Sequence, residues 1–172
     1  MADTTTVIKK VKRSDFASFL NVGKKDSLKW ARMGKGITSQ QIAYNPQTTS
    51  ETFIDEDSAT TSVDSYAPTM NTPQTAYAGD PVFDFVDDLR QRRAVGADCE
   101  TEMLLVYIYD GEGSSYAAEK QKVAIQVDDF GGDGGASNVI NYTLNFVGES
   151  EKGTCSIVDG TPTFTKTTAT TN

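Results

Sequence analysis

The sequence of 172 residues contains no histidine. Histidine is the commonest general acid or base in enzymes and the commonest side-chain ligand of metals. Its absence excludes the Ser-His-Asp and Cys-His catalytic arrangements and most zinc sites. Enzymes that rely only on carboxylates, lysine or tyrosine are still compatible with the sequence. The missing histidine is therefore an argument against catalysis without being a proof.

Cysteines and long apolar runs are also scarce. The two cysteines, Cys99 and Cys155, form no short-spaced motif, and we expect two reduced, packed thiols. The N-terminal residues lack the apolar core of about 7–15 residues that a signal peptide needs. No apolar run approaches the ~20 residues of a membrane span. We therefore expect a protein without a membrane anchor that is made and folded in a cytoplasm.

Positive charge is missing from the middle of the chain. Residues 1–35 carry nine basic and three acidic side chains, whereas residues 36–89 carry nine acidic side chains and no lysine or arginine. The net charge of −8 disfavours tight binding of nucleic acid. One interpretation of the middle segment is a solvated acidic face. The other is electrostatic attraction between the basic N-terminal region of one copy and the acidic middle of the next, a head-to-tail contact that builds rings or open stacks.

Alternating apolar residues and turn signals predict a mainly β protein with one helix. The fold class expected is two packed antiparallel β-sheets, as a sandwich or half-barrel, flanked by one α-helix, with a long hairpin loop and terminal arms. We expect short strands over residues 16–22, 27–32, 48–54, 65–75, 102–109, 116–127, 138–146 and 153–158, with 37–45 also extended. One domain over 16–160 would carry an N-terminal arm (1–15) and a C-terminal arm or tail (161–172).

The helix is predicted over residues 81–93. Asp80 suits the N-cap, and Pro81 suits the first helical position, where its missing N–H costs nothing. Acidic residues lie early and arginines late in this segment, as the helix dipole favours. Apolar residues at i, i+3, i+4 and i+7 form one face: Val82, Phe85, Val86 and Leu89.

Two groups of carboxylates resemble a metal site and a catalytic site. Residues 128–135 combine aspartates with glycines, as calcium loops do, but the ligand spacing of an EF-hand is missing and a flexible hairpin loop is favoured. Glu100 and Glu102 share one face of a predicted strand and could imitate a glycosidase pair. A solvent-facing strand explains them more simply. We expect no enzyme activity, no metal and no cofactor.

The order of features resembles a known family. A basic N-terminal arm precedes LKWARMG (28–34), an acidic hairpin runs through SQQIAYNP (39–46), TFIDED (52–57) and VDSY (63–66), and GDPVFDFV (79–86) opens the helix. Paired strands then end at FVG (146–148). This layout, over about residues 20–160, resembles the major tail protein, or tail tube protein, of long-tailed bacteriophages, especially those of Gram-positive bacteria.

The resemblance implies a structural subunit that self-assembles into rings of six. In that family four strands per subunit join into one β-barrel around a channel, the rings stack into a tube that conducts viral DNA, and arms and hairpin loop reach between rings. The resemblance also implies a place in the virion tail after assembly in the host cytoplasm. The tape measure, tail terminator and distal tail proteins would be partners, and double-stranded DNA would pass through without specific binding.

Carried over to this chain, the resemblance assigns three groups of residues. The inter-ring loop is expected at residues 55–64, with Asp55, Glu56, Asp57 and Asp64. The channel strands are expected within 37–54 and 65–75, with Gln41, Thr49, Glu51 and Phe53 as candidate channel residues, although Pro68 and Pro73 interrupt the second segment. The basic N-terminal arm contributes Lys9, Lys10, Lys12 and Arg13.

Physical chemistry supports the acidic channel independently, because a negative wall repels phosphate and keeps passing DNA from sticking. Ring closure would also pair strand edges that are otherwise prone to aggregation. The alternative is an immunoglobulin-like or jelly-roll module that binds to or decorates a virion. Such a module shares the β content but explains neither the segregated charge nor the long acidic hairpin.

Overall fold

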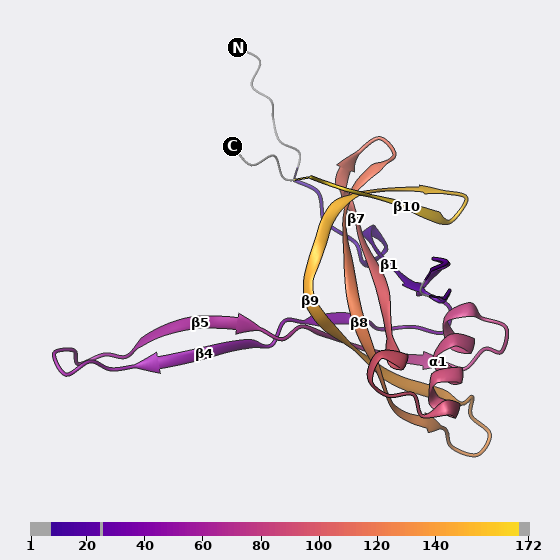
Figure 1. The fold of residues 1–172 in the computed structure, drawn as a ribbon, viewed down its shortest axis with the longest axis horizontal. Helices are drawn as coiled ribbons and strands as arrows, with labels where there is room; N and C mark the ends of the chain where they lie inside the picture. The colour runs from indigo at the N-terminus through magenta and orange to yellow at the C-terminus, as the bar shows by residue number, and fades with distance from the viewer. Residues whose placement is uncertain (1–7, 25, 169–172) are drawn as a thin grey trace, which may run out of the picture.

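The computed structural model describes residues 8–24 and 26–168 and shows a mainly β protein from which one long hairpin projects (Figure 1). The strands are β1 (Phe16–Asn21), β2 (Trp30–Arg32), β3 (Gln41–Ala43), β4 (Pro46–Glu51), β5 (Thr60–Tyr66), β6 (Thr69–Thr75), β7 (Glu100–Glu112), β8 (Ser115–Gly131), β9 (Val139–Val158) and β10 (Thr161–Lys166). One α-helix, α1 (Pro81–Arg92), and two short 3-10 helices, η1 (Arg13–Asp15) and η2 (Gly96–Cys99), complete the described part of the chain.

The strands form two antiparallel sheets. Eight strands make the main sheet, in the order β2-β1-β7-β8-β9-β6-β3, with β10 paired to β9 outside this path. The other sheet is the two-stranded β4–β5 hairpin, which extends away from the body (Figure 1). The predicted fold class, mainly β with antiparallel sheets and one helix, is confirmed.

Strands β8 and β9 are longer than the sequence suggested. A break was expected between residues 146 and 153, yet β9 runs through this region as one strand of 20 residues. Gly148 adopts φ 68°, which suits glycine, where the pairing with β8 shifts between Lys120 and Lys122. Gln121 donates its side-chain N–H to the carbonyl oxygens of Val147 at 3.0 Å and Gly148 at 3.4 Å. A bulge satisfied by one glutamine thus replaces the expected turn.

The C-terminal segment joins the sheet. Residues 161–172 were expected to form an arm or tail, but Thr161–Lys166 pairs with β9 as β10. Asp159 (φ 48°) and Gly160 (φ 76°) make the connection, and positive φ at both positions is what a two-residue hairpin turn requires. At the other end, residues 1–7 of the expected N-terminal arm lie outside the described residues. The described remainder of that arm is exposed up to η1.

The core lies on both faces of β7. On one face Met103 and Leu105 pack with the buried side of α1, including Val86. On the other face Leu104 and Val106 form a second cluster. Phe19, Cys155 and the half-buried Phe164 complete that second cluster, so β10 helps to cover it. Burial on both sides explains why the run around residues 103–106 is apolar without alternation.

Helix α1 begins at the predicted residue and ends at Arg92, one residue before the predicted end. The Asp80 carboxylate accepts a hydrogen bond from the Phe83 N–H at 2.9 Å, and Pro81 occupies the first turn. Arg93 ends the helix in a left-handed conformation, with φ 50°. The helix packs beside the ends of β8 and β9 in Figure 1. Within the described ranges, no helix has the length and apolar character needed to cross a membrane.

Candidate assembly surfaces

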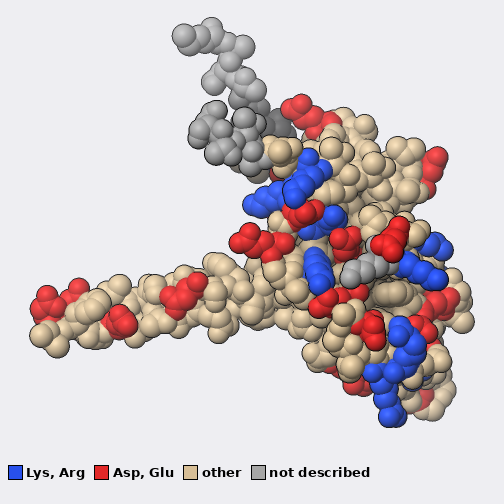
Figure 2. All heavy atoms as spheres, in the orientation of Figure 1, with Lys and Arg blue, Asp and Glu red and all other residues tan. Residues whose placement is uncertain are grey.

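The projecting hairpin, residues 46–66, is exposed along its whole length. Its tip, residues 52–59, joins β4 to β5. Five carboxylates and no lysine or arginine lie on it: Glu51, Asp55, Glu56, Asp57 and Asp64. Figure 2 shows acidic side chains spaced along the hairpin, while the basic side chains in this view lie on the body. The negative charge of the middle segment is therefore concentrated on a thin extension of the molecule.

The root of the hairpin is fixed by Asn45. This residue adopts φ 46°, a left-handed conformation that asparagine tolerates better than most residues. Its side-chain N–H groups donate to the Ala67 carbonyl oxygen at 3.0 Å and to the Thr69 hydroxyl at 3.2 Å. Tyr44 and Tyr66 meet edge to face across the root, with ring centroids 6.4 Å apart. These contacts set the direction in which the hairpin leaves the sheet.

Asp64 lies in β5 and not in the loop where the sequence interpretation placed it. Its carboxylate accepts hydrogen bonds from the hydroxyls of Thr49 and Ser62. These two hydrogen bonds, that of Thr49 first, lower the pKa of Asp64 below its ordinary value. Asp64 therefore ties β4 to β5. The loop is shorter than expected because β5 already begins at Thr60. Asp55, Glu56 and Asp57 lie in this loop.

The four candidate channel residues are split between two places. Gln41 lies on β3, within the main sheet. Thr49 and Glu51 lie on β4 of the hairpin, and Phe53 lies in the tip, outside any strand. Of the segments expected to line a channel, only β3 and β6 belong to the main sheet. The β4–β5 hairpin lies between β3 and β6 in the sequence, and it forms a separate sheet.

On strands β3, β6, β8 and β9, a polar face covers the side of the main sheet opposite α1. It comprises Gln41, Asn71, Gln126, Asp128, Asn141, Thr143 and Asn145, which we call the polar face. Hydrogen bonds cross it from strand to strand: Asn71 donates to Thr143 at 3.4 Å, and Thr143 donates to Asp128 at 3.0 Å. Sequence reasoning identified only Gln41 here, although the alternation in 138–146 marked the polar side of β9.

The aspartates that suggested a calcium loop are part of this surface. Asp128 accepts from Gln126 and Thr143, and Asp129 accepts from the Asn141 side chain at 2.6 Å. Across the described residues, no group of three or more acidic or cysteine side chains is placed to hold a metal ion. Asp128 and Asp129 thus act as hydrogen-bond acceptors for neighbouring strands.

The described basic residues near the N-terminus, which we call the basic segment, are Lys9, Lys10, Lys12 and Arg13. All four are exposed, and none makes an ion pair with a described carboxylate. Arg13 donates to the Phe16 carbonyl oxygen at 2.6 Å, and its guanidinium lies 5.0 Å from the centre of the Phe16 ring. The hairpin carboxylates likewise pair with no described lysine or arginine. Among the described residues, both charged elements therefore lack an ion-pair partner.

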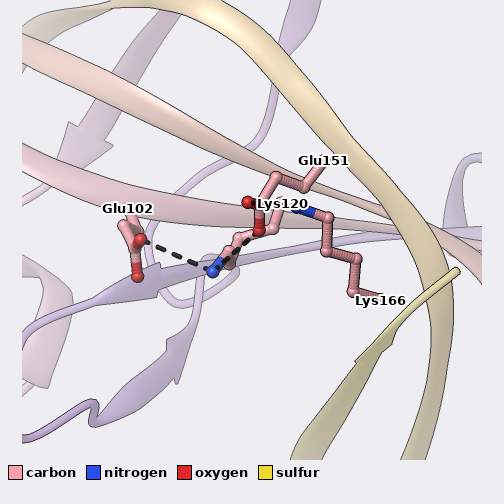
Figure 3. Close-up of polar contacts among 4 residues, drawn as sticks. All are labelled: Glu102, Lys120, Glu151 and Lys166. Atoms are coloured by element: carbon pink, nitrogen blue, oxygen red, sulfur yellow. Dashed lines mark hydrogen bonds and ion pairs between the residues drawn. The ribbon is translucent and has the colours of Figure 1, made fainter. Parts of the chain in front are cut away.

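A network of ion pairs fastens β7, β8, β9 and β10 (Figure 3). The Lys120 ammonium lies 3.0 Å from a Glu151 oxygen and 3.7 Å from a Glu102 oxygen. Lys166 lies 2.8 Å from the other Glu151 oxygen. These contacts, that with Lys166 first, lower the pKa of Glu151, and the hydrogen bond to Glu151 raises the pKa of Lys120.

The same network accounts for the carboxylates that imitated a glycosidase pair. Glu102 contacts Lys120, and Glu100 pairs with Lys122 on the adjacent strand. Each lysine lies diagonally across from its carboxylate on the neighbouring strand, and opposite charges within reach of each other in this way stabilise strand pairing. The arrangement therefore holds the sheet together by cross-strand charge.

A cleft of about 800 Å³ opens at the root of the hairpin. Its apolar wall consists of Ile42, Tyr44, Tyr66, Leu105, Tyr107 and Phe146. Tyr107 also stacks on Phe16, with ring centroids 5.5 Å apart. Burial, then the nearby Glu119 carboxylate and neighbouring tyrosines, raise the pKa of Tyr107. The sequence interpretation did not find this cleft, because its wall combines residues from β3, β5, β7 and β9.

The fold described above, an antiparallel sheet with one helix and a projecting hairpin, is similar to solved structures of two tails. The SPP1 phage tail tube aligns with a TM-score of 0.65 and 10% identity, over 88% of this chain and 82% of that chain. The tail of an empty GTA particle, a gene transfer agent, aligns with a TM-score of 0.60 and 11% identity, over 82% of this chain and 97% of that chain. The chain therefore shares the fold of tail tube proteins. Protein-family models and curated proteins give no match to the sequence.

Proposed function

We propose that the protein is the structural subunit of a phage-type tail tube. Copies assemble into stacked rings around a channel through which DNA passes, and the protein performs no catalysis. The observation that carries this proposal is the hairpin, which is exposed on both faces in a chain with the tail tube fold. An isolated two-stranded hairpin is marginally stable in water. Contact with other copies would supply the missing packing surface.

The polar face of the main sheet is the surface we propose for the channel wall. It lies opposite the helix and bears amides, hydroxyls and the Asp128 carboxylate. A wall of this chemistry offers no cations to phosphates, so the counterion release that drives DNA binding does not occur. Of the candidate channel residues proposed from the sequence, Gln41 belongs to this wall. Thr49, Glu51 and Phe53 belong to the contacts between copies.

Assembly into rings of six is part of the proposal. The GTA tail was determined with C6 symmetry, which supports the same number for this chain. Asp55, Glu56 and Asp57 would contact the neighbouring ring, and Lys9, Lys10, Lys12 and Arg13 would provide complementary charge. The assembled tube would lie in the virion tail after assembly in the host cytoplasm. By resemblance its partners would be a tape measure protein, a tail terminator and a distal tail protein.

Negative-stain electron microscopy of the purified protein tests the proposal. We expect rings or tubes from the unmodified chain. Replacing Asp55, Glu56 and Asp57 together by lysine should hinder ring stacking, because the hairpin would then repel the basic segment. In the matched control, lysine replaces Asp98, Glu112 and Asp133, which are exposed and lie outside the hairpin. This control should assemble normally.

Two outcomes would count against the proposal. A stable monomer at every salt concentration in analytical ultracentrifugation would favour the decoration-module alternative, which should stay small. Unchanged stacking of the hairpin variant would remove the role of the acidic tip between rings while leaving the tube itself in place.

A further inference from the structure

We propose that Phe53 and Ile54 at the hairpin tip of one copy insert into the tyrosine-lined cleft at the hairpin root of another copy. This inference rests on the proposed self-assembly and names the pair of surfaces that would carry it. The occupant of the cleft is a second copy of this chain, and the contact is apolar at its centre with charges around it.

The tip presents apolar side chains to solvent. Phe53 is 53% exposed and Ile54 is fully exposed, directly before the three acidic residues 55–57. These large apolar side chains stand at the end of an otherwise polar, acidic extension, and the described residues leave at least half of their surface exposed. Removing them from water is favourable, so they provide a driving force for a contact between copies.

The cleft is a suitable receptor for these side chains. Its wall is built from Ile42, Tyr44, Tyr66, Leu105, Tyr107 and Phe146, and its volume of about 800 Å³ leaves room for more than one apolar side chain. Tyr44 and Tyr66 are 57% and 60% exposed, so aromatic surface faces solvent at the cleft mouth. Aromatic residues of this kind commonly anchor contacts between proteins.

One molecule cannot satisfy its own cleft. The six residues of β4 separate the cleft at the root from the tip, a distance of about 20 Å at the usual rise of a strand. Figure 1 shows the hairpin extending straight away from the body. Tip and receptor thus lie at opposite ends of the hairpin, and their contact is head-to-tail. Such a contact leaves one free tip and one free cleft after each addition.

Charge favours the same pairing. The basic segment leads directly to the cleft, because Arg13 covers the Phe16 ring and Phe16 stacks on Tyr107 of the cleft wall. A tip seated in the cleft would bring residues 55–57 toward Lys12 and Arg13 of the receiving copy. Glu119, Glu149 and Lys152 also border the cleft, so the basic segment adds positive charge to a rim that carries both signs.

Site-specific photocross-linking tests the contact directly. The photoreactive residue p-benzoylphenylalanine is introduced at position 54, the concentrated protein is irradiated, and cross-linked peptides are identified by mass spectrometry. We expect intermolecular links to peptides that contain Tyr44, Tyr66 or Tyr107. The same probe at position 95, where Val95 is 77% exposed on the body, should not label the cleft.

Complementary variants provide a second measurement. The double substitution Phe53→Ser with Ile54→Ser removes the tip, and Tyr44→Arg fills the cleft mouth with charge. Each variant alone should need at least a tenfold higher concentration to assemble, whereas Val95→Ser should behave like the unmodified chain. A mixture of the two variants should yield a pair, since one supplies an intact cleft and the other an intact tip. Circular dichroism confirms that each variant is folded.

The outcomes separate this inference from the tube function. Tubes whose cross-links lie outside the cleft would overturn the docking and leave the function intact. Cross-linked pairs through the cleft without rings or tubes would support the docking and contradict the function. A sample with neither assembly nor cross-linked pairs would contradict both.

Discussion

The Tyr142 hydroxyl donates a hydrogen bond to the Gln74 side-chain oxygen at 3.1 Å in the interior of the protein. The Gln74 side-chain nitrogen in turn donates to the Asp80 carboxylate and to the Lys35 carbonyl oxygen, each at 3.0 Å. Asp80 is the N-cap of α1. A chain of hydrogen bonds thus connects β9, β6 and the start of the helix through the core, and burial raises the pKa of Tyr142.

The substitution Tyr142→Phe should destabilise the protein by about 1–3 kcal/mol, because it leaves the buried Gln74 oxygen without a donor. Urea denaturation followed by circular dichroism measures the change. Tyr109→Phe is the matched control, since Tyr109 is 53% exposed, and it should stay within about 0.5 kcal/mol of the unmodified protein. Equal effects from the two substitutions would contradict the importance of the core hydrogen bond.

Asp80→Ala should cost about 0.5–2 kcal/mol, since it removes the acceptor for the Phe83 N–H and weakens the N-terminus of the helix. Asp80→Asn should recover much of this loss, because asparagine is also a good N-cap. Asp88→Ala removes only an exposed ion pair with Arg92 and should cost about 0.3–0.5 kcal/mol at most. The midpoints of thermal unfolding rank the stability of the three variants. If Asp88→Ala were the least stable of them, the result would contradict the role of Asp80 as the helix cap.

The ion pairs around Glu151 predict a loss of stability in acid. Because the folded protein lowers the pKa of Glu151, the stabilisation is complete above the unfolded value of about 4.3 and is lost as the pH falls through the lower folded value. Glu151→Gln should therefore be less stable than the unmodified protein at pH 7, and the two should converge as the pH falls below the lowered pKa of Glu151. Urea midpoints across this range provide the measurement, with Glu149→Gln as an exposed control. A stability gap that stays constant between pH 7 and the lowest pH at which both proteins remain folded would rule out titration of Glu151 as its source.

Assembly should weaken as salt is added, provided that the hairpin carboxylates attract the basic segment. The Debye length falls from about 10 Å at 0.1 M to about 3 Å at 1 M ionic strength, which screens exposed charges. The neutral variant with Asp55→Asn, Glu56→Gln and Asp57→Asn should lose this dependence. Sedimentation at several salt concentrations compares the two proteins. Stronger assembly of the unmodified chain in high salt would show that apolar contacts alone dominate.

The helix was predictable from the sequence because its signals are local. Asp80, Pro81 and the spacing of Val82, Val86 and Leu89 act within a few residues of one another, and the structure confirms each of them. The acidic hairpin was predictable for the same reason, although its loop is shorter than expected. Local alternation also identified the strand that contains Tyr142.

Features that depend on distant residues were missed. The continuity of β9 depends on Gln121, a residue of β8 that satisfies the carbonyls beside Gly148. The cleft could not be read from the sequence, because its wall joins four strands. The turn at Asp159 and Gly160 did carry a local signal, since Asp-Gly favours a two-residue hairpin turn. That signal predicts a strand after residue 160, where we expected an arm.

The charged residues of the hairpin are all acidic, and this affects solubility. As a sheet of only two strands, the hairpin leaves the outer edges of both β4 and β5 without a partner strand in the part of the chain that the structure describes. Unpaired edges invite pairing with the same element of another molecule, which leads to aggregation. Five carboxylates and no cation make two hairpins repel each other. The charge therefore keeps these edges from pairing with themselves while a subunit waits to be added.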